Sequence, residues 1–204
     1  MANIFLTSNG FYTDMIKNEF LTVLNKQLPN PKAAIITTAS PQKENNRYAV
    51  KAKNDLFGMG VKQVEFLDIE FEEVKKLKQY NIIYINGGNP FSLLYHMKKS
   101  GADIILKALS KQNTIFIGVS AGAVILGPNI EVANHFTPLM NTTEVKDLTA
   151  LNKTEKVIFP HYDREDIFKD NSGKSIEDRL MEFEITKQSS VIILKDDQYS
   201  LINV

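Results

Sequence analysis

The sequence contains no cysteine. Disulfide bonds, thiolate zinc sites, cysteine-ligated iron–sulfur clusters and catalysis by a cysteine nucleophile are therefore excluded. The three histidines are scattered along the chain and, without cysteine, give no spacing typical of metal ligands. We expect a protein without metal or cofactor, and the lack of cysteine favours a cytoplasmic location.

Neither sign of charge is in excess, because 24 lysines and arginines balance 24 aspartates and glutamates. Nucleic-acid-binding proteins normally carry a basic excess, so we expect no nucleic-acid partner. No apolar run approaches the roughly 20 residues of a membrane-spanning helix. The apolar run at residues 4–6 is also too short for a signal peptide, so neither a membrane partner nor secretion is expected.

The composition is that of an ordinary globular protein, with 204 residues, of which 43% are hydrophobic and 24% charged. A chain of this length can bury enough surface to fold without a disulfide or a metal. Because the sequence contains no linker, low-complexity segment or internal repeat, we predict one domain spanning residues 1–204.

Apolar segments rich in β-branched residues alternate with segments of helical periodicity in the first two thirds of the chain. The predicted strands are residues 4–7, 33–39, 64–69, 82–86 and 114–119. The predicted helices are residues 14–28, 46–57, 71–79, 90–100, 103–111 and 121–126. This alternation predicts an α/β fold with a mostly parallel sheet covered by helices on both faces.

The last third of the sequence is less regular. The elements predicted there are a loop or hairpin over residues 131–147, a short strand over 157–160, a helix over 175–186, and strands over 191–194 and 199–204. Because only four residues separate the last two strands, they are predicted to form a terminal β-hairpin.

Residues 118–122 have the pattern G-x-S-x-G, which places Ser120 between two glycines. The pattern follows a predicted strand and precedes a predicted helix, which is the context of a nucleophile elbow. In such a turn the serine side chain stands clear of the backbone, and the next N–H, on Ala121, points toward a developing oxyanion. We predict Ser120 as a nucleophile; the alternative is a tight turn without chemistry.

A serine hydroxyl needs a base, usually a histidine, to act as a nucleophile. His96 falls within a predicted helix and His135 within the irregular stretch, where it could line a pocket, whereas His161 follows the predicted strand 157–160. Functional groups gather beyond the carboxyl ends of strands in parallel sheets. We therefore predict His161 as the base.

Two further groups are needed around such a pair. One is a carboxylate that fixes the imidazole tautomer. The sequence alone leaves five candidates open, which are Glu131, Glu144, Asp163, Asp196 and Asp197. The other is a second donor to the oxyanion, and the glycine-rich turn at residues 86–90 can offer backbone N–H groups to an anion. We expect Gly88 and Asn89 to form, with Ala121, an oxyanion hole and part of the substrate-binding site.

These motifs together resemble peptidase family S51, the group of the aspartyl dipeptidases (peptidase E) and cyanophycinase. The G-G-N segment of that family corresponds to residues 87–94, its S-A-G-A elbow to residues 120–123, and its Pro-His pair to Pro160 and His161. The first two motifs lie about thirty residues apart, and the match covers nearly the whole chain.

The resemblance implies a three-layer α/β/α sandwich related to class I glutamine amidotransferases, and a serine peptidase that hydrolyses small, dipeptide-like substrates. It also implies a triad in the chain order serine, histidine, acid, with the acid in a turn after a late strand. The matching turn, residues 195–198, favours Asp196, with Asp197 as the near alternative and Glu131 still open. The expected partner is a small peptide, and a homodimer is compatible with the sequence.

One position departs from the aspartyl dipeptidases. The arginine with which they hold the aspartate carboxylate of the substrate corresponds to Ile176 here, within residues 173–179. Lys174 or Arg179 could substitute, although neither offers an equivalent fork for a carboxylate. We therefore do not expect strict specificity for an N-terminal aspartate.

Two other classes of function remain open. An α/β-hydrolase-type esterase shares G-x-S-x-G but needs the chain order serine, acid, histidine, with Glu131, Glu144 or Asp147 as the acid. A non-catalytic relative would bind a small ligand in the same pocket without turnover. Amidotransferase activity is excluded because it needs a cysteine.

Overall fold

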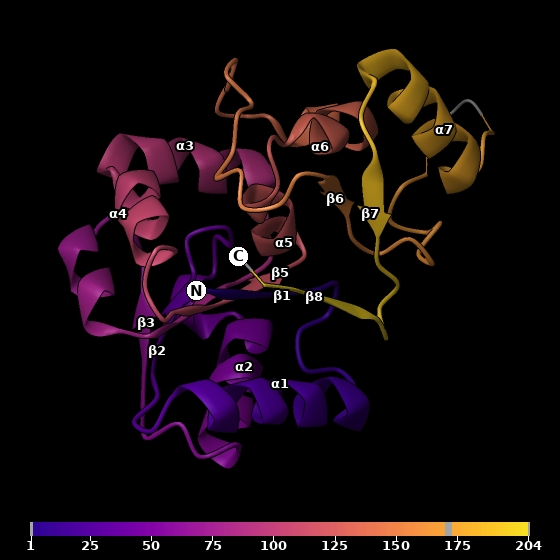
Figure 1. The fold of residues 1–204 in the computed structure, drawn as a ribbon. Coiled ribbons are helices and arrows are strands. Elements are labelled where there is room, and N and C mark those ends of the chain that lie inside the picture. The colour runs from indigo at the N-terminus through magenta and orange to yellow at the C-terminus, as the bar shows by residue number, and fades with distance from the viewer. Residues whose placement is uncertain (1, 170–172, 204) are drawn as a thin grey trace.

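A six-stranded sheet forms the centre of the computed structural model, which describes residues 2–169 and 173–203 (Figure 1). Its strands are β1 (Asn3–Thr7), β2 (Lys32–Ile36), β3 (Gln63–Leu67), β4 (Ile82–Ile85), β5 (Ile115–Val119) and β8 (Tyr199–Asn203). The strand order is β3-β2-β4-β5-β1-β8, and every neighbouring pair is parallel except β1 and β8. This sheet confirms the predicted α/β fold.

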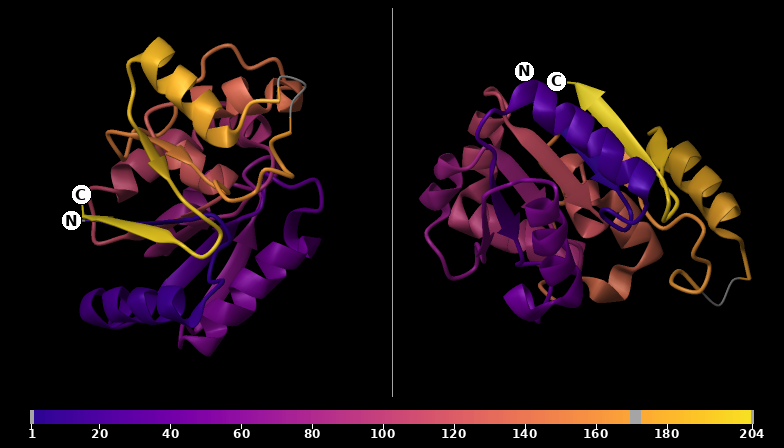
Figure 2. Two further views of the ribbon diagram at one scale, coloured as in Figure 1. Left: turned by 90° about the vertical axis from the view of Figure 1, so that its right-hand side faces the viewer. Right: turned by 90° about the horizontal axis from the view of Figure 1, so that it is seen from below.

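Helices cover both faces of the sheet and make three layers (Figure 2). One face carries α1 (Asp14–Gln27) and α2 (Arg47–Gly58), and the other carries α3 (Pro90–Ser100), α4 (Ala102–Leu109) and α5 (Ala121–Leu126). Side chains alternate along each strand, so β1 contributes Ile4 and Leu6 to one core and Phe5 to the other. The predicted helix at residues 71–79 is a shorter 3₁₀ helix, η2 (Val74–Gln79).

The C-terminal third forms a second, two-stranded sheet beside the first. Its elements are α6 (Glu131–Phe136), the 3₁₀ helix η3 (Pro138–Met140), β6 (Val157–Phe159), α7 (Ile176–Lys187) and β7 (Val191–Ile193). The strands β6 and β7 are parallel to each other. Helix α7 begins as predicted, because Ser175 and Asp178 form a reciprocal capping box.

Two sequence predictions in this third are wrong. Strands β7 and β8 do not form a hairpin; β7 pairs with β6, and β8 pairs antiparallel with β1 at the edge of the large sheet. The ring of Tyr199 stacks on Phe5, with centroids 5.0 Å apart, which favours pairing with β1. Residues 131–147 also contain helix α6, whose buried Val132 and Phe136 are too few to show a period.

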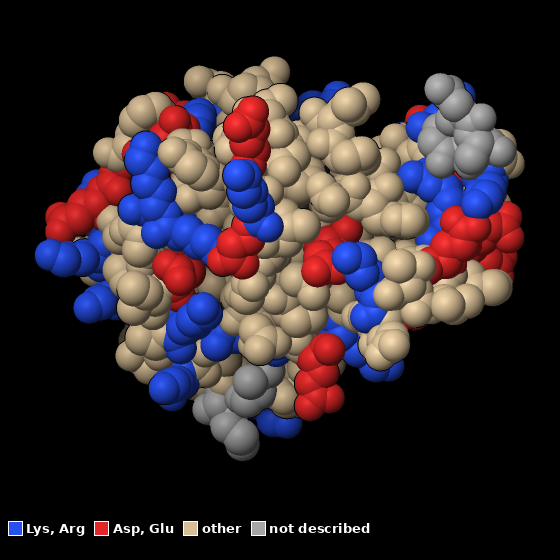
Figure 3. All heavy atoms as spheres, turned by 90° about the horizontal axis from the view of Figure 1, so that it is seen from above, with Lys and Arg blue, Asp and Glu red and all other residues tan. Residues whose placement is uncertain are grey.

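The surface is mixed in charge. On the face shown in Figure 3, lysine and arginine side chains lie among aspartate and glutamate side chains, with uncharged residues between them. Across the described ranges, no helix has the length and apolar character needed to cross a membrane.

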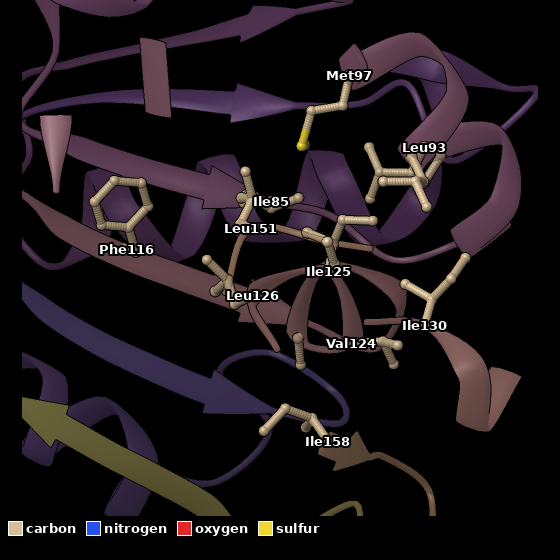
Figure 4. Packing of buried hydrophobic residues seen from close by; sticks show 14 of the residues in the cluster. Ile85, Leu93, Met97, Phe116, Val124, Ile125, Leu126, Ile130, Leu151 and Ile158 are labelled. Carbon is tan, nitrogen blue, oxygen red and sulfur yellow. The ribbon is translucent and has the colours of Figure 1, made fainter. Parts of the chain in front are cut away.

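Helix α5 is fully buried against the sheet. All six of its residues are buried, and Val124, Ile125 and Leu126 pack among Ile85, Leu151 and other apolar side chains (Figure 4). Its second residue, Gly122, lies against β4, because a Cβ added there would be 2.0 Å from the carbonyl oxygen of Ile85. Contact this close fixes the start of the helix relative to the sheet.

Replacing Gly122 with alanine is expected to lower the free energy of unfolding by more than about 2 kcal/mol, because β4 and α5 must move apart. Gly58→Ala is the matched control, since nothing lies within 4 Å of a Cβ built at that helix-terminal glycine. The control should be neutral or slightly stabilising. Urea unfolding of both variants makes the comparison, and equal midpoints would contradict the close packing at Gly122.

Candidate active site

Ser120 occupies a strained turn between β5 and α5. Its backbone has φ 51° and ψ −115°, a conformation that side-chain-bearing residues rarely adopt. The flanking glycines make this turn possible: a Cβ at Gly118 would lie 2.7 Å from the carbonyl oxygen of Gly122. The G-x-S-x-G pattern thus forms the strand–turn–helix geometry of a nucleophile elbow.

The imidazole of His161 lies between Ser120 and Asp196. Its Nε2 is 3.0 Å from Ser120 Oγ, and its Nδ1 is 2.6 Å from Asp196 Oδ1. With Nδ1–H donating to the carboxylate, Nε2 is left to accept the hydroxyl proton of the serine. The structure therefore brings together the three residues favoured from the sequence, in hydrogen-bonding order.

Asp196 lies in the connection between β7 and β8. Neighbouring side chains hold it on the side that faces away from His161. Arg164 Nη1 is 3.3 Å from Asp196 Oδ2, and the backbone N–H of Asp196 donates to Asp163 Oδ1 at 3.0 Å. Two hydrogen bonds raise the pKa of the Arg164 guanidinium, the larger effect coming from Asp166 and the smaller from Asp196. The cation beside Asp196 therefore stays charged. The two oxygens of Asp196 thus have separate partners, one imidazole and one guanidinium.

Ser8, at the carboxyl end of β1, holds the histidine and acid segments together. Its buried hydroxyl donates to the carbonyl of Leu194 at 2.9 Å and accepts the backbone N–H of His161 at 3.0 Å. His161 also has a positive φ of 59°, which turns the chain sharply after β6. One hydroxyl therefore joins β1 to the segments that follow β6 and β7.

The turn after β4 faces Ser120. A Cβ at Gly87 would lie 3.0 Å from Ser120 Cβ. Gly88 has φ 143°, and a Cβ added there would lie only 2.2 Å from the carbonyl oxygen of Ala39. Position 88 therefore requires glycine, and a side chain at Gly87 would crowd Ser120. Among the described residues, no acceptor takes a hydrogen bond from the N–H of Gly88 or of Ala121. These two N–H groups remain the candidates for an oxyanion hole.

Asn89 shapes the same turn through its side chain. Its Oδ1 accepts the N–H groups of Phe91 and Ser92, which caps α3, and its Nδ2 donates to the carbonyl of Met140 at 2.7 Å. The side chain is therefore engaged in fixing the fold, although the residue lines the cavity described next.

A cavity of about 500 Å³ opens beside Ser120 and His161. Its walls come from the carboxyl ends of β1, β2, β4 and β5, from α2, and from the segments after β6 and β7. A volume of this size suits a small molecule or a short peptide. No cluster of metal-ligating side chains was found within the described ranges.

The other candidate bases and acids lie elsewhere. Glu131 forms an ion pair with Lys187 at 2.8 Å, and Asp197 is exposed and does not line the cavity. His135 packs against the ring of Phe183 with centroids 5.6 Å apart, and His96 is 3.7 Å from Glu70. Neither of these histidines lines the cavity.

The segment compared with the substrate-binding arginine of the aspartyl dipeptidases also lies away from the cavity. Ile176 is buried in the core, and Arg179 donates to the carbonyl of Phe168 while its guanidinium lies 4.1 Å from the ring centroid of Phe136. Lys174 forms an ion pair with Glu182. Neither basic side chain lines the cavity, so neither occupies the position that the sequence comparison suggested for it.

Sequence reasoning missed Ser8, Lys51 and Arg164, all of which line the cavity. Ser8 directly follows a predicted strand, and the rule that selected His161 would also have selected it. Arg164 follows His161 by three residues, so the same turn could have suggested it. Lys51 lies within a helix, and its helical position carries no signal that it faces a cavity.

Comparison with known proteins agrees with the fold. A family model described as Peptidase family S51 matches residues 4–203. The uncharacterized peptidase Lmo0363 of Listeria monocytogenes is 33% identical over 166 residues, covering 79% of this chain and 78% of the relative. Peptidase E of Actinobacillus pleuropneumoniae is 27% identical over 203 residues, covering 94% of this chain and 81% of that protein.

Two solved structures are also similar. The crystal structure of a Listeria monocytogenes EGD-e protein assigned to peptidase E has a TM-score of 0.71 at 28% identity, covering 99% of this chain and 94% of that chain. A peptidase from an acI-B1 actinobacterium has a TM-score of 0.73 at 15% identity, covering 100% and 84%, which shows the fold alone.

The mostly parallel sheet, with a serine on a sharp turn at its carboxyl edge, is the architecture of a hydrolase. The chain belongs to peptidase family S51, and it is a serine peptidase.

Proposed function

We propose that this serine peptidase hydrolyses small, dipeptide-like substrates through a triad of Ser120, His161 and Asp196. The observation that carries the proposal is the unbroken hydrogen-bonded series from Asp196 through His161 to Ser120, with distances of 2.6 and 3.0 Å. These are the distances expected of a nucleophile, its base and the group that orients the base.

In the proposed reaction, His161 Nε2 takes the proton of Ser120 as Oγ attacks the carbonyl carbon of the scissile bond. The N–H groups of Gly88 and Ala121 then stabilise the oxyanion. The protonated imidazole, held by Asp196, gives its proton to the leaving amine, and the acyl group stays on Ser120. A water molecule, deprotonated by His161, then releases the acid product and restores the serine.

The order of the three residues along the chain supports this proposal over the esterase alternative. An α/β-hydrolase places its acid between the serine and the histidine. Here the carboxylate that contacts His161 is Asp196, which follows the histidine in the chain. The carboxylates that the esterase hypothesis needed, such as Glu131 and Asp147, pair with Lys187 and Lys98.

The dipeptides Asp-Leu, Ala-Leu and Leu-Leu test the proposal and its specificity together. We expect Ala-Leu and Leu-Leu to be hydrolysed with kcat/KM at least equal to that of Asp-Leu. The cations on the cavity wall are already paired, Lys51 with Asp55 at 2.5 Å and Arg164 with Asp166 and Asp196. A desolvated carboxylate without its own cation costs several kcal/mol.

Versions of each dipeptide with a blocked N-terminus serve as the control for the position of cleavage. A hundredfold preference for Asp-Leu would contradict the expected specificity. It would mean that Lys51 or Arg164 exchanges its partner for the substrate. If the enzyme at high concentration hydrolyses none of the three free dipeptides, the proposed dipeptide substrate is contradicted.

A further inference from the structure

Asn86 carries a buried side-chain amide without hydrogen-bond partners. The residue is 1% exposed, and neither its Oδ1 nor its Nδ2 has a partner among the described residues. Native proteins pair the great majority of such atoms, because a buried amide that makes no hydrogen bond is destabilising. An orphaned carboxamide beside a reactive serine therefore needs an explanation.

The position of Asn86 relates this amide to the cavity. The residue directly follows β4, and its backbone N–H donates to the carbonyl of Ile36, which extends the strand pairing by one residue. Because side chains alternate along a strand, Asn86 points to the same face as Tyr84. Both residues line the cavity, and the next residue, Gly87, lies against Ser120.

The charged groups on the cavity wall already have partners. Lys51 donates to Asp55 and to the carbonyl of Phe11, and Asp55 also pairs with Lys17. Arg164, Asp196 and His161 pair with one another or with Asp166, as described above. The apolar part of the wall includes Phe11, Ala39, Ala52, Val119 and Ile167, and Tyr84 contributes an aromatic ring with a hydroxyl.

We infer that Asn86 is a specificity-determining residue that binds a neutral carboxamide side chain, that of asparagine or glutamine, on the residue whose carbonyl is attacked. This inference rests on the proposed function. A carboxamide matches Asn86 in both directions, since each amide has one NH₂ donor and one oxygen acceptor. A carboxylate would satisfy only Nδ2, and an aliphatic side chain would leave both atoms unpaired.

Both amide atoms are buried in the structure, so the inference requires the Asn86 side chain to turn toward the cavity when the substrate binds. The terminal torsion, which is broad in asparagine, then sets the direction of the amide. In the proposed complex the scissile carbonyl of the substrate lies at Ser120 and faces the N–H groups of Gly88 and Ala121. The side chain of the same substrate residue then extends toward the adjacent wall, where Asn86 lies between Tyr84 and Gly87.

Binding without turnover tests this inference. The dipeptides Asn-Leu, Asp-Leu and Leu-Leu differ in a side chain of nearly constant size, and their affinities are measured by calorimetry on Ser120→Ala and on Ser120→Ala/Asn86→Leu. On Ser120→Ala we expect Asn-Leu to bind about tenfold or more tightly than either of the others. The added Asn86→Leu change should abolish this preference or reverse it in favour of Leu-Leu.

Asn134→Leu in the same Ser120→Ala background is the matched control, since Asn134 is exposed on α6 and does not line the cavity. It should leave all three affinities unchanged. Equal binding of Asn-Leu and Leu-Leu to Ser120→Ala, or a preference that survives Asn86→Leu, would overturn the inference. Hydrolysis by the wild-type enzyme is measured separately, so a failure of the proposed function is distinguished from a failure of the role given to Asn86.

Discussion

Replacing Ser120 with alanine is expected to reduce kcat for dipeptide hydrolysis by about four orders of magnitude or more, to the background of the assay. The hydroxyl lies 3.0 Å from His161 Nε2, and no other hydroxyl was found in contact with this imidazole nitrogen within the described residues. The fold should remain intact, because the change removes one oxygen from a partly exposed side chain.

A fluorophosphonate probe gives a second readout of the same change. Labelling requires an activated hydroxyl, so the wild-type protein should react at Ser120 and the Ser120→Ala variant should not. Ser100→Ala is the control, since Ser100 lies at the end of α3, where its hydroxyl donates to the carbonyl of Met97 and accepts the N–H of Ala102. Turnover close to the wild-type rate in purified Ser120→Ala would refute the role of this serine.

The second large effect is expected at the carboxylate. Asp196→Asn should lower kcat by about a thousandfold or more, with a much smaller change in KM. The neutral amide of asparagine lacks the negative charge with which the Asp196 carboxylate stabilises the imidazolium that forms during reaction. It also removes one of the two charged partners of Arg164, and Asp166 remains as the other.

Asp197→Asn is the matched control, because it makes the same chemical change at the next residue. Asp197 is exposed and does not line the cavity, so its kcat should stay within about threefold of the wild type. Steady-state kinetics with Leu-Leu compares the two. Equal losses in both variants would show that the turn as a whole, rather than the Asp196 carboxylate, matters for catalysis.

Features that depend on nearby residues were predictable from the sequence. The strand before Ser120, the two glycines around it and the short helix after it all lie within about a dozen residues, and their pattern was sufficient. The G-G-N turn was predictable for the same reason. The alternation of strands and helices along the chain also predicted a mostly parallel sheet.

Features that depend on distant residues were not predictable in the same way. Four residues between the predicted strands 191–194 and 199–204 suggested a hairpin, but the pairing was decided by β1 and β6, which lie far away in the sequence. The direction of Asp196 and Asp197 was also undetermined, since a turn alone does not say which side chain faces inward. Asn86 was read only as the start of a glycine-rich turn, because its unpaired amide is a property of three-dimensional packing.

The site draws its parts from two sheets. Ser120 ends a strand of the six-stranded sheet, His161 follows a strand of the two-stranded sheet, and Asp196 lies in the connection between the two. A chain in which the large sheet alone had formed would hold the elbow and the glycine turn in place and would still be inert. Loss of the two-stranded sheet alone would therefore separate His161 from Ser120 even where the large sheet stays intact.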